Sequence, residues 1–101
     1  MEGSYKARLK VNQKPVAMNR FVEEFVARTM AGAVTSLKGA EDIRNLIIHQ
    51  KKGNVEITVN GSEIPLTPFP NDIISNTLVG MVSALRDVED IDNVDLSVDA
   101  E

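Results

Sequence analysis

The chain has few residues that could do chemistry, and the first to consider is its single histidine, His49. An imidazole is a common general base near neutral pH, but it needs a partner that orients it or a nucleophile that it activates. The sequence has no cysteine, and no serine stands in a Gly-x-Ser-x-Gly context. We therefore interpret His49 as an outward-facing strand residue, and we expect no catalytic residue and no enzyme activity.

An acidic run at residues 87–95 is the strongest candidate for a metal site. Its carboxylates are oxygen ligands of the kind that calcium and magnesium prefer. However, the spacing does not match the EF-hand loop, and the glycine at that loop's sixth position is missing. A solvated connector explains the run more simply, so we predict no metal and no cofactor. The acidic residues are Asp87, Glu89, Asp90, Asp92 and Asp95.

Phosphate and nucleic-acid binding also find little support. Phosphate-binding loops are rich in glycine and open a helix, and neither expected helix start contains a glycine. A basic row, Lys6, Arg8 and Lys10, is able to contact a nucleic-acid backbone, but no aromatic residue accompanies it on its side of the strand. With a formal net charge of −4 as well, nucleic acid is not expected as a partner.

These residues lie in a chain that contains one pattern twice. A shift of 48 residues aligns 11–48 with 59–96 without a gap and gives eleven identities. Self-similarity of this kind indicates repeated structural units. The identical pairs are Val11/Val59, Asn12/Asn60, Phe21/Phe69, Thr29/Thr77, Gly32/Gly80, Val34/Val82, Leu37/Leu85, Glu41/Glu89, Asp42/Asp90, Ile43/Ile91 and Asn45/Asn93.

Each copy opens with a strand signal. Residues 5–11 and 55–59 alternate apolar and polar side chains, as half-buried strands do. Asn60-Gly61 then predicts a hairpin, because both central residues of a type I′ turn need positive φ. Asn12-Gln13 occupies the same place in the first copy. Short returning strands are expected after both turns, and whether they join the sheet stays open at this point.

A helix follows in each copy, and a last strand follows each helix, at 45–49 and 94–99. Asn19 and Thr67 are good N-cap residues. The apolar spacing predicts one broad buried helix face. That face comprises Phe21, Phe25, Val26, Met30, Ala33, Val34 and Leu37 in the first copy and Phe69, Ile73, Ile74, Leu78, Met81, Val82 and Leu85 in the second.

Both expected helices also keep a glycine in their interior, within Thr29-x-x-Gly32 and Thr77-x-x-Gly80. A glycine at such a position costs about 1 kcal/mol relative to alanine. The usual compensation is the close approach of another backbone, either the sheet or the other helix. We therefore interpret these four residues as helix-packing positions.

The resulting fold prediction is α+β: tandem duplicated β(β)αβ units that share one largely antiparallel sheet. Residues 1–101 form a single domain of two pseudo-symmetric repeats, about 5–50 and 53–98, because the connection at 51–54 is too short for an interdomain linker. Right-handed crossovers place the two helices on one face. Without the short strands the order is βαββαβ, as in the ferredoxin-like fold; with them, the fold is a variant with added short strands.

The phrase at 59–69, VNGSEIPLTPF, leads into the Thr77-x-x-Gly80 helix and an acidic connector. It resembles small prokaryotic proteins of unknown function that carry one "VNGxEIPLxPF…TxxG" unit. The resemblance covers the second half of the chain and reaches the first half only through the internal repeat. It implies a fused pair of units and brings no activity with it.

The charge differs between the copies. Residues 1–50 carry eight Lys/Arg and five Asp/Glu, a balance of +3, whereas residues 51–101 carry three and ten, a balance of −7. We expect this asymmetry to reflect complementary surfaces within the fold or between chains. A homodimer in which the basic half meets the acidic half is one such arrangement.

Two function classes follow from these observations. The first is a non-catalytic protein-interaction or assembly module, with an interaction surface on the outer sheet face. The second is a small-molecule-binding or regulatory accessory domain that uses the cleft between the repeats. No apolar run is long enough to span a membrane, and we expect a cytoplasmic protein. The expected surface residues are Lys6, Arg8, Lys10, Ile47, His49, Glu56 and Asp95.

Overall fold

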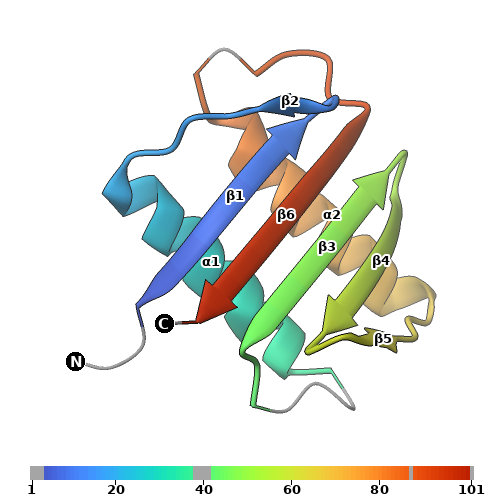
Figure 1. The fold of residues 1–101 in the computed structure, drawn as a ribbon. Helices are drawn as coiled ribbons and strands as arrows, with labels where there is room; N and C mark the ends of the chain where they lie inside the picture. The colour runs from blue at the N-terminus through green and yellow to red at the C-terminus, as the bar shows by residue number, and fades with distance from the viewer. Residues whose placement is uncertain (1–3, 38–41, 87, 101) are drawn as a thin grey trace.

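The computed structural model describes residues 4–37, 42–86 and 88–100. Within them, strand, short strand, helix and strand follow one another twice (Figure 1). The first copy contains β1 (Tyr5–Val11), β2 (Lys14–Pro15), α1 (Arg20–Thr35) and β3 (Asn45–Lys51). The second contains β4 (Asn54–Val59), β5 (Ser62–Ile64), α2 (Pro68–Ser83) and β6 (Asn93–Ala100).

The strands form one antiparallel sheet in the order β2-β1-β6-β3-β4-β5. Both helices cover the same face of this sheet and leave the other face open (Figure 1). The α+β class, the shared antiparallel sheet and the placement of the helices are therefore as predicted. The ferredoxin-like order is not confirmed, because that fold places the first and third long strands at its centre, whereas here the second and fourth, β3 and β6, are central.

The strand registers follow the same 48-residue shift as the sequence. Val11 pairs with Val94 in one half, and Val59 pairs with Leu46 in the other. The central pairing of β3 with β6 is symmetric about the pair Ile48 and Leu96. A pseudo-twofold axis normal to the sheet therefore passes at this pair, and exchanging the copies reverses the strand order onto itself.

The hairpin turns adopt the predicted geometry in both copies. Asn60 and Gly61 have φ of 50° and 87°, and Asn12 and Gln13 have φ of 53° and 70°. The short strands β2 and β5 do pair with the preceding strands, although β2 is only two residues long. Gln13 thus occupies a left-handed conformation that its repeat counterpart, Gly61, adopts without steric cost.

The core lies between the sheet and the two helices. Alternate residues of the long strands point toward the helices, and the helices contribute their sheet-facing side. The largest fully buried side chains are Met30, Leu46, Ile48, Ile57, Leu78 and Leu96. Burial of aliphatic surface at about 25 cal/mol per Å² is the main stabilising contribution in such a core.

One polar pair interrupts this core. Gln50 and Ser75 are 6% and 4% exposed, and the Gln50 side-chain amide donates to the Ser75 hydroxyl at 3.3 Å. The Gln50 Oε1 atom has no hydrogen-bond partner within the described part of the protein. The repeat counterparts of this pair are Val98 and Ala27, so the same position in the other copy is apolar.

The helix caps differ between the copies. The Asn19 side chain accepts a hydrogen bond from the Val22 amide at 2.9 Å, as predicted for an N-cap. Thr67 occupies the equivalent position but makes no side-chain cap hydrogen bond. Pro68 follows it at the first helical position, where the missing amide has no partner to lose. The start of α2 therefore depends on proline more than on its cap.

The buried helix face is narrower than the sequence pattern indicates. Phe21, Phe25, Phe69 and Ile73 were expected in the core, but they are 74%, 51%, 72% and 49% exposed. The sheet covers only one side of each helix. That side is centred on Val26, Met30 and Val34 in α1 and on Ile74, Leu78 and Val82 in α2.

The helix-packing interpretation of Gly32 and Gly80 is also wrong. Both glycines are exposed, and a Cβ atom built on either would meet no heavy atom within 4 Å. Thr29 and Thr77 are half-buried beside them. The glycines therefore lie on the outward side of the helices, together with the exposed apolar residues, because all of them fall about half a turn away from the sheet-facing side.

Candidate functional site

The open face of the sheet brings together all seven residues of the predicted interaction surface. Strand alternation points them away from the helices, and the register sets their neighbours. Lys10 lies opposite Asp95, Asp95 opposite His49, and His49 opposite Glu56. A row of one lysine, two carboxylates and one histidine thus crosses four strands, while Lys6, Arg8 and Ile47 occupy neighbouring rows.

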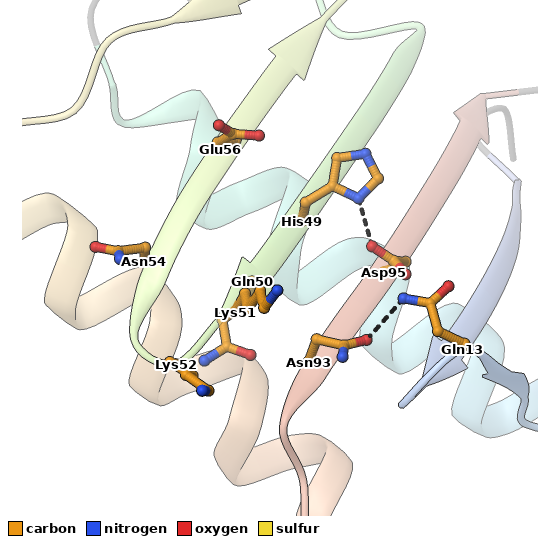
Figure 2. Close-up of a pocket in the computed structure, with 9 residues that line it drawn as sticks. All are labelled: Gln13, His49, Gln50, Lys51, Lys52, Asn54, Glu56, Asn93 and Asp95. Carbon is orange, nitrogen blue, oxygen red and sulfur yellow. Dashed lines mark hydrogen bonds and ion pairs between the residues drawn. The ribbon is translucent and has the colours of Figure 1, made fainter.

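His49 and Asp95 form the most specific contact on this face. The His49 Nδ1 atom hydrogen-bonds the Asp95 Oδ1 atom (Figure 2), and the two side chains are 55% and 27% exposed. Their repeat counterparts are Ser97 and Ile47, which also face each other across β3 and β6. The histidine–carboxylate pair therefore occurs on one side of the pseudo-twofold axis only.

Beside this pair lies a shallow polar hollow of about 510 Å³ (Figure 2). It sits where the two copies meet, and Gln13 on its rim donates to the Asn93 side chain at 3.2 Å. A carboxylate that holds an imidazole favours one tautomer of the ring, but no hydroxyl or thiol lies among the described lining residues. The geometry suits hydrogen bonding to a polar ligand. The lining residues are Gln13, His49, Gln50, Lys51, Lys52, Asn54, Glu56, Asn93 and Asp95.

The basic strip of β1 is matched within the sheet itself. Lys6 lies opposite Asp99 and Lys10 lies opposite Asp95 on the adjacent strand β6, whereas Arg8 faces Ser97. Such cross-strand pairs contribute about 0.2–1 kcal/mol each. Neighbouring strands of one chain therefore bring two of the lysines of the first copy opposite two aspartates of the second.

The acidic connector before β6 has a structural explanation in the asparagine of the first hairpin turn. The Asn12 Oδ1 atom accepts hydrogen bonds from the backbone amides of Asp92 and Asn93 at 2.7 and 3.1 Å, and its amide donates to the Asp90 carbonyl at 2.9 Å. We call this set of contacts the asparagine latch. It fastens the turn of the first copy to the connector of the second.

The second copy repeats the asparagine latch in the opposite sense. The Asn60 Oδ1 atom accepts from the amides of Arg44 and Asn45, both at 2.9 Å, and its amide donates to the Asp42 carbonyl at 3.0 Å. Asp42 and Asp90 have equivalent positive φ values of 54° and 50°. These side-chain contacts explain the repeated identity Asn12/Asn60, whereas the connector residues take part through backbone atoms.

Among the described residues, no group of three or more histidine, aspartate or glutamate side chains is placed to hold a metal ion. Asp87, the first carboxylate of the run, lies outside the described residues.

The outer edges of the sheet are occupied by side chains from the helices. The Glu23 carboxylate accepts from the Ala7 amide at 2.8 Å and Glu24 accepts from the Tyr5 amide at 3.2 Å, while Asn71 accepts from Val55 at 2.8 Å on the other edge. These contacts satisfy amides that an added strand would otherwise use. At these positions of β1 and β4, an added strand would have to displace the helix side chains.

Glu24 is the residue whose titration this arrangement changes. The hydrogen bond from the Tyr5 amide is the largest influence and holds the pKa of the Glu24 carboxyl below its ordinary value. Burial opposes this effect, while Arg28 and Arg20 favour the ionised form. Arg28 contacts Glu24 at 2.8 Å, and Arg20 contacts it at 3.3 Å.

A second surface lies on the opposite side of the molecule, where the helices face away from the sheet. We call Phe21, Phe25, Phe69 and Ile73 the apolar helix face. The rings of Phe21 and Phe25 stack with centroids 6.0 Å apart. Next to Phe69 and Ile73 runs an apolar groove of about 330 Å³ between the start of α2 and the end of α1.

Sequence reasoning assigned this surface to the core because helical periodicity does not say how much of an apolar arc the sheet covers. The lack of charged residues nevertheless indicated that the outward side of α2 is unusually apolar. α2 has a single charged residue in its sixteen positions, Asp72, whereas a helix with one exposed side normally carries charges there. α1 has four: Arg20, Glu23, Glu24 and Arg28.

Comparison with known proteins returned no match to any family model, curated protein or solved structure. In the described residues, no helix is both long and apolar enough to cross a membrane. The open face of the sheet and the apolar helix face are therefore the features that bear on function.

Proposed function

We propose that the protein is a non-catalytic interaction module that binds a protein partner through the apolar helix face. The observation that carries the proposal is the exposure of Phe21 and Phe69, at 74% and 72%. These are two of the three phenylalanines in the chain. Phenylalanine side chains gain about 1.5–3 kcal/mol each when they are fully removed from water, so a partner that covers them gains substantial free energy.

The distribution of charge supports the same surface. Interface centres are depleted in charged residues and enriched in aromatic ones. α2 fits this pattern with its single charge and its exposed Phe69 and Ile73. The sheet face has the opposite character, since charged and polar side chains dominate it and Ile47 is the one large aliphatic side chain that its described strands point outward. The helix face is therefore the better protein-binding surface.

Capture with matched variants tests the proposal. The tagged full chain is expressed in its native cells as wild type, as the double variant Phe21→Lys and Phe69→Lys, and as the control variant Ile47→Lys. Because both phenylalanines are exposed, the double variant should fold, which circular dichroism checks. Proteins that bind wild type and the control but not the double variant support the proposal. A bound set that the double variant leaves unchanged refutes it.

The second candidate is a small-molecule-binding domain, and the observation that favours it is the polar hollow beside His49 and Asp95. Polar groups from both copies converge there, as in ligand sites at the junction of repeats. Thermal-shift screening with polar metabolites tests this function. A compound that raises the Tm of wild type but not that of Asp95→Ala supports it, and a screen in which every hit also stabilises the variant refutes it.

A further inference from the structure

The outward side of α2 has a pattern that fits a second copy of itself. The exposed positions Phe69, Ile73, Asn76 and Gly80 follow one another at intervals of four, three and four residues. This spacing places them in one stripe along the helix. The stripe has large apolar side chains in its first half and an amide and a glycine in its second half.

We infer that the protein forms a twofold homodimer in which α2 packs antiparallel against α2 of the partner subunit. This inference rests on the proposed function of the apolar helix face. Antiparallel pairing places Phe69 against Gly80 of the partner subunit and Ile73 beside Asn76 of the partner subunit. The twofold axis makes each contact twice, and the interface is closed.

The glycine supplies the space that this pairing needs. At Gly80 a Cβ atom would meet no heavy atom within 4 Å, so the surface of one chain is open there. A glycine within a helix costs about 1 kcal/mol relative to alanine, and among the described residues no close approach to the Cβ position offsets this cost. In the dimer, the phenylalanine ring of the second copy packs over Gly80, and this contact accounts for a glycine at that position.

The rest of the face is consistent with a large contact. α1 has the equivalent stripe, Phe21, Phe25, Arg28 and Gly32, and it lies beside α2 on the same side of the sheet (Figure 1). The molecule is a slab with extents of 35, 34 and 18 Å. A standard interface buries roughly 800 Å² per partner, so the contact would extend over α1 as well as α2.

Self-association also explains why protruding and recessed positions occur on one stripe. An unrelated partner needs only the protruding residues or only a groove. A surface that is complementary to itself under a twofold rotation needs both. The stripe of α2 provides both within twelve residues, with one charged residue in the whole helix.

Sedimentation of the purified full chain at tens of micromolar tests the inference. We expect a dimer that persists in high salt, because apolar contacts are not screened. Phe69→Lys should weaken dimerisation by about tenfold or more, the effect of losing one hot-spot side chain. Gly80→Leu should also weaken it by filling the recess, although the open space around Gly80 lets the monomer accept the leucine. Circular dichroism verifies the fold of both variants.

Ile47→Lys on the sheet face is the matched control, and it should leave the dimer intact. A wild-type chain that remains monomeric overturns the inference. A dimer that dissociates in high salt or with Ile47→Lys, but survives Phe69→Lys, also overturns it and assigns the contact to the sheet face. The proposed function is refuted by a separate result, in which the Phe21→Lys and Phe69→Lys double variant captures the same proteins from cells as wild type.

Discussion

Replacing Asn60 tests the asparagine latch, because three hydrogen bonds and a positive φ depend on that one side chain. Each bond contributes about 0.5–1.5 kcal/mol, and exposed ones lie at the lower end. Together the three bonds provide about 2 kcal/mol. Alanine also pays about 1 kcal/mol for a left-handed conformation. Asn60→Ala should therefore lower the free energy of unfolding by about 3 kcal/mol.

Two matched variants separate these contributions. Asn60→Gly removes the bonds but accepts the positive φ, so it should cost about 2 kcal/mol. Asn60→Asp keeps the oxygen that accepts from Arg44 and Asn45 but replaces the donor to the Asp42 carbonyl with a second acceptor, which should cost between about 1 and 2 kcal/mol. Asn12→Ala should cost as much as Asn60→Ala, and the double variant should be additive because the sites share no contacts.

Urea unfolding followed by far-UV circular dichroism at fixed protein concentration measures these differences. The expected order of destabilisation is alanine, then glycine, then aspartate. If all three variants unfold within about 0.5 kcal/mol of wild type, water replaces the lost contacts and the latch does not hold the copies together. An aspartate variant as unstable as the alanine one would show that the donated bond dominates, against the reasoning above.

Three further changes are expected to have effects of defined sign. Gln13→Gly should stabilise the protein by about 1 kcal/mol in urea melts, because it relieves a positive φ as Gly61 does in the other copy; unchanged or lower stability would contradict this reason. Gln50→Leu combined with Ser75→Ala should be neutral or stabilise by about 1 kcal/mol, because a buried oxygen without a partner is removed; a clear loss of stability would show that this oxygen is satisfied in solution. The Glu24 carboxyl has a lowered pKa in the folded state, so its contribution to stability is present above its unfolded pKa and is lost as pH falls through the folded pKa. Glu24→Gln should therefore flatten the acid side of a plot of Tm against pH. An unaltered slope would contradict this role of Glu24.

The candidate sites were predicted unequally. Strand alternation was enough to place Lys6, Arg8, Lys10, Ile47 and His49 on one outward face, because side chains on a strand follow a period of two. Their neighbours were not predictable in the same way. The contact of His49 with Asp95 depends on β6 lying next to β3 in one register, and pairing between distant segments leaves no local signature.

The apolar helix face shows that helical periodicity does not predict how much of an apolar arc is buried. Phe21, Phe25, Phe69 and Ile73 fall within the apolar arc, and the pattern correctly indicates helices that begin after Asn19 and Thr67. How wide a part of the arc is buried depends on what packs against the helix. In the part of the chain that the structure describes, the sheet covers one side of each helix, so the outer part of the arc remains exposed.

The sequence by itself determined the strands, the helices and the hairpin turns, because hydrophobic alternation, helical spacing and the φ demands of Asn-Gly are local properties that act within a few residues. The tertiary structure decided the order β2-β1-β6-β3-β4-β5 and the reciprocal asparagine latches between the copies. It also turned Gly80 outward, away from the sheet. These features depend on which segments meet across long separations. These long-range contacts are selected by the packing of the whole chain, which the local spacing of residues does not encode.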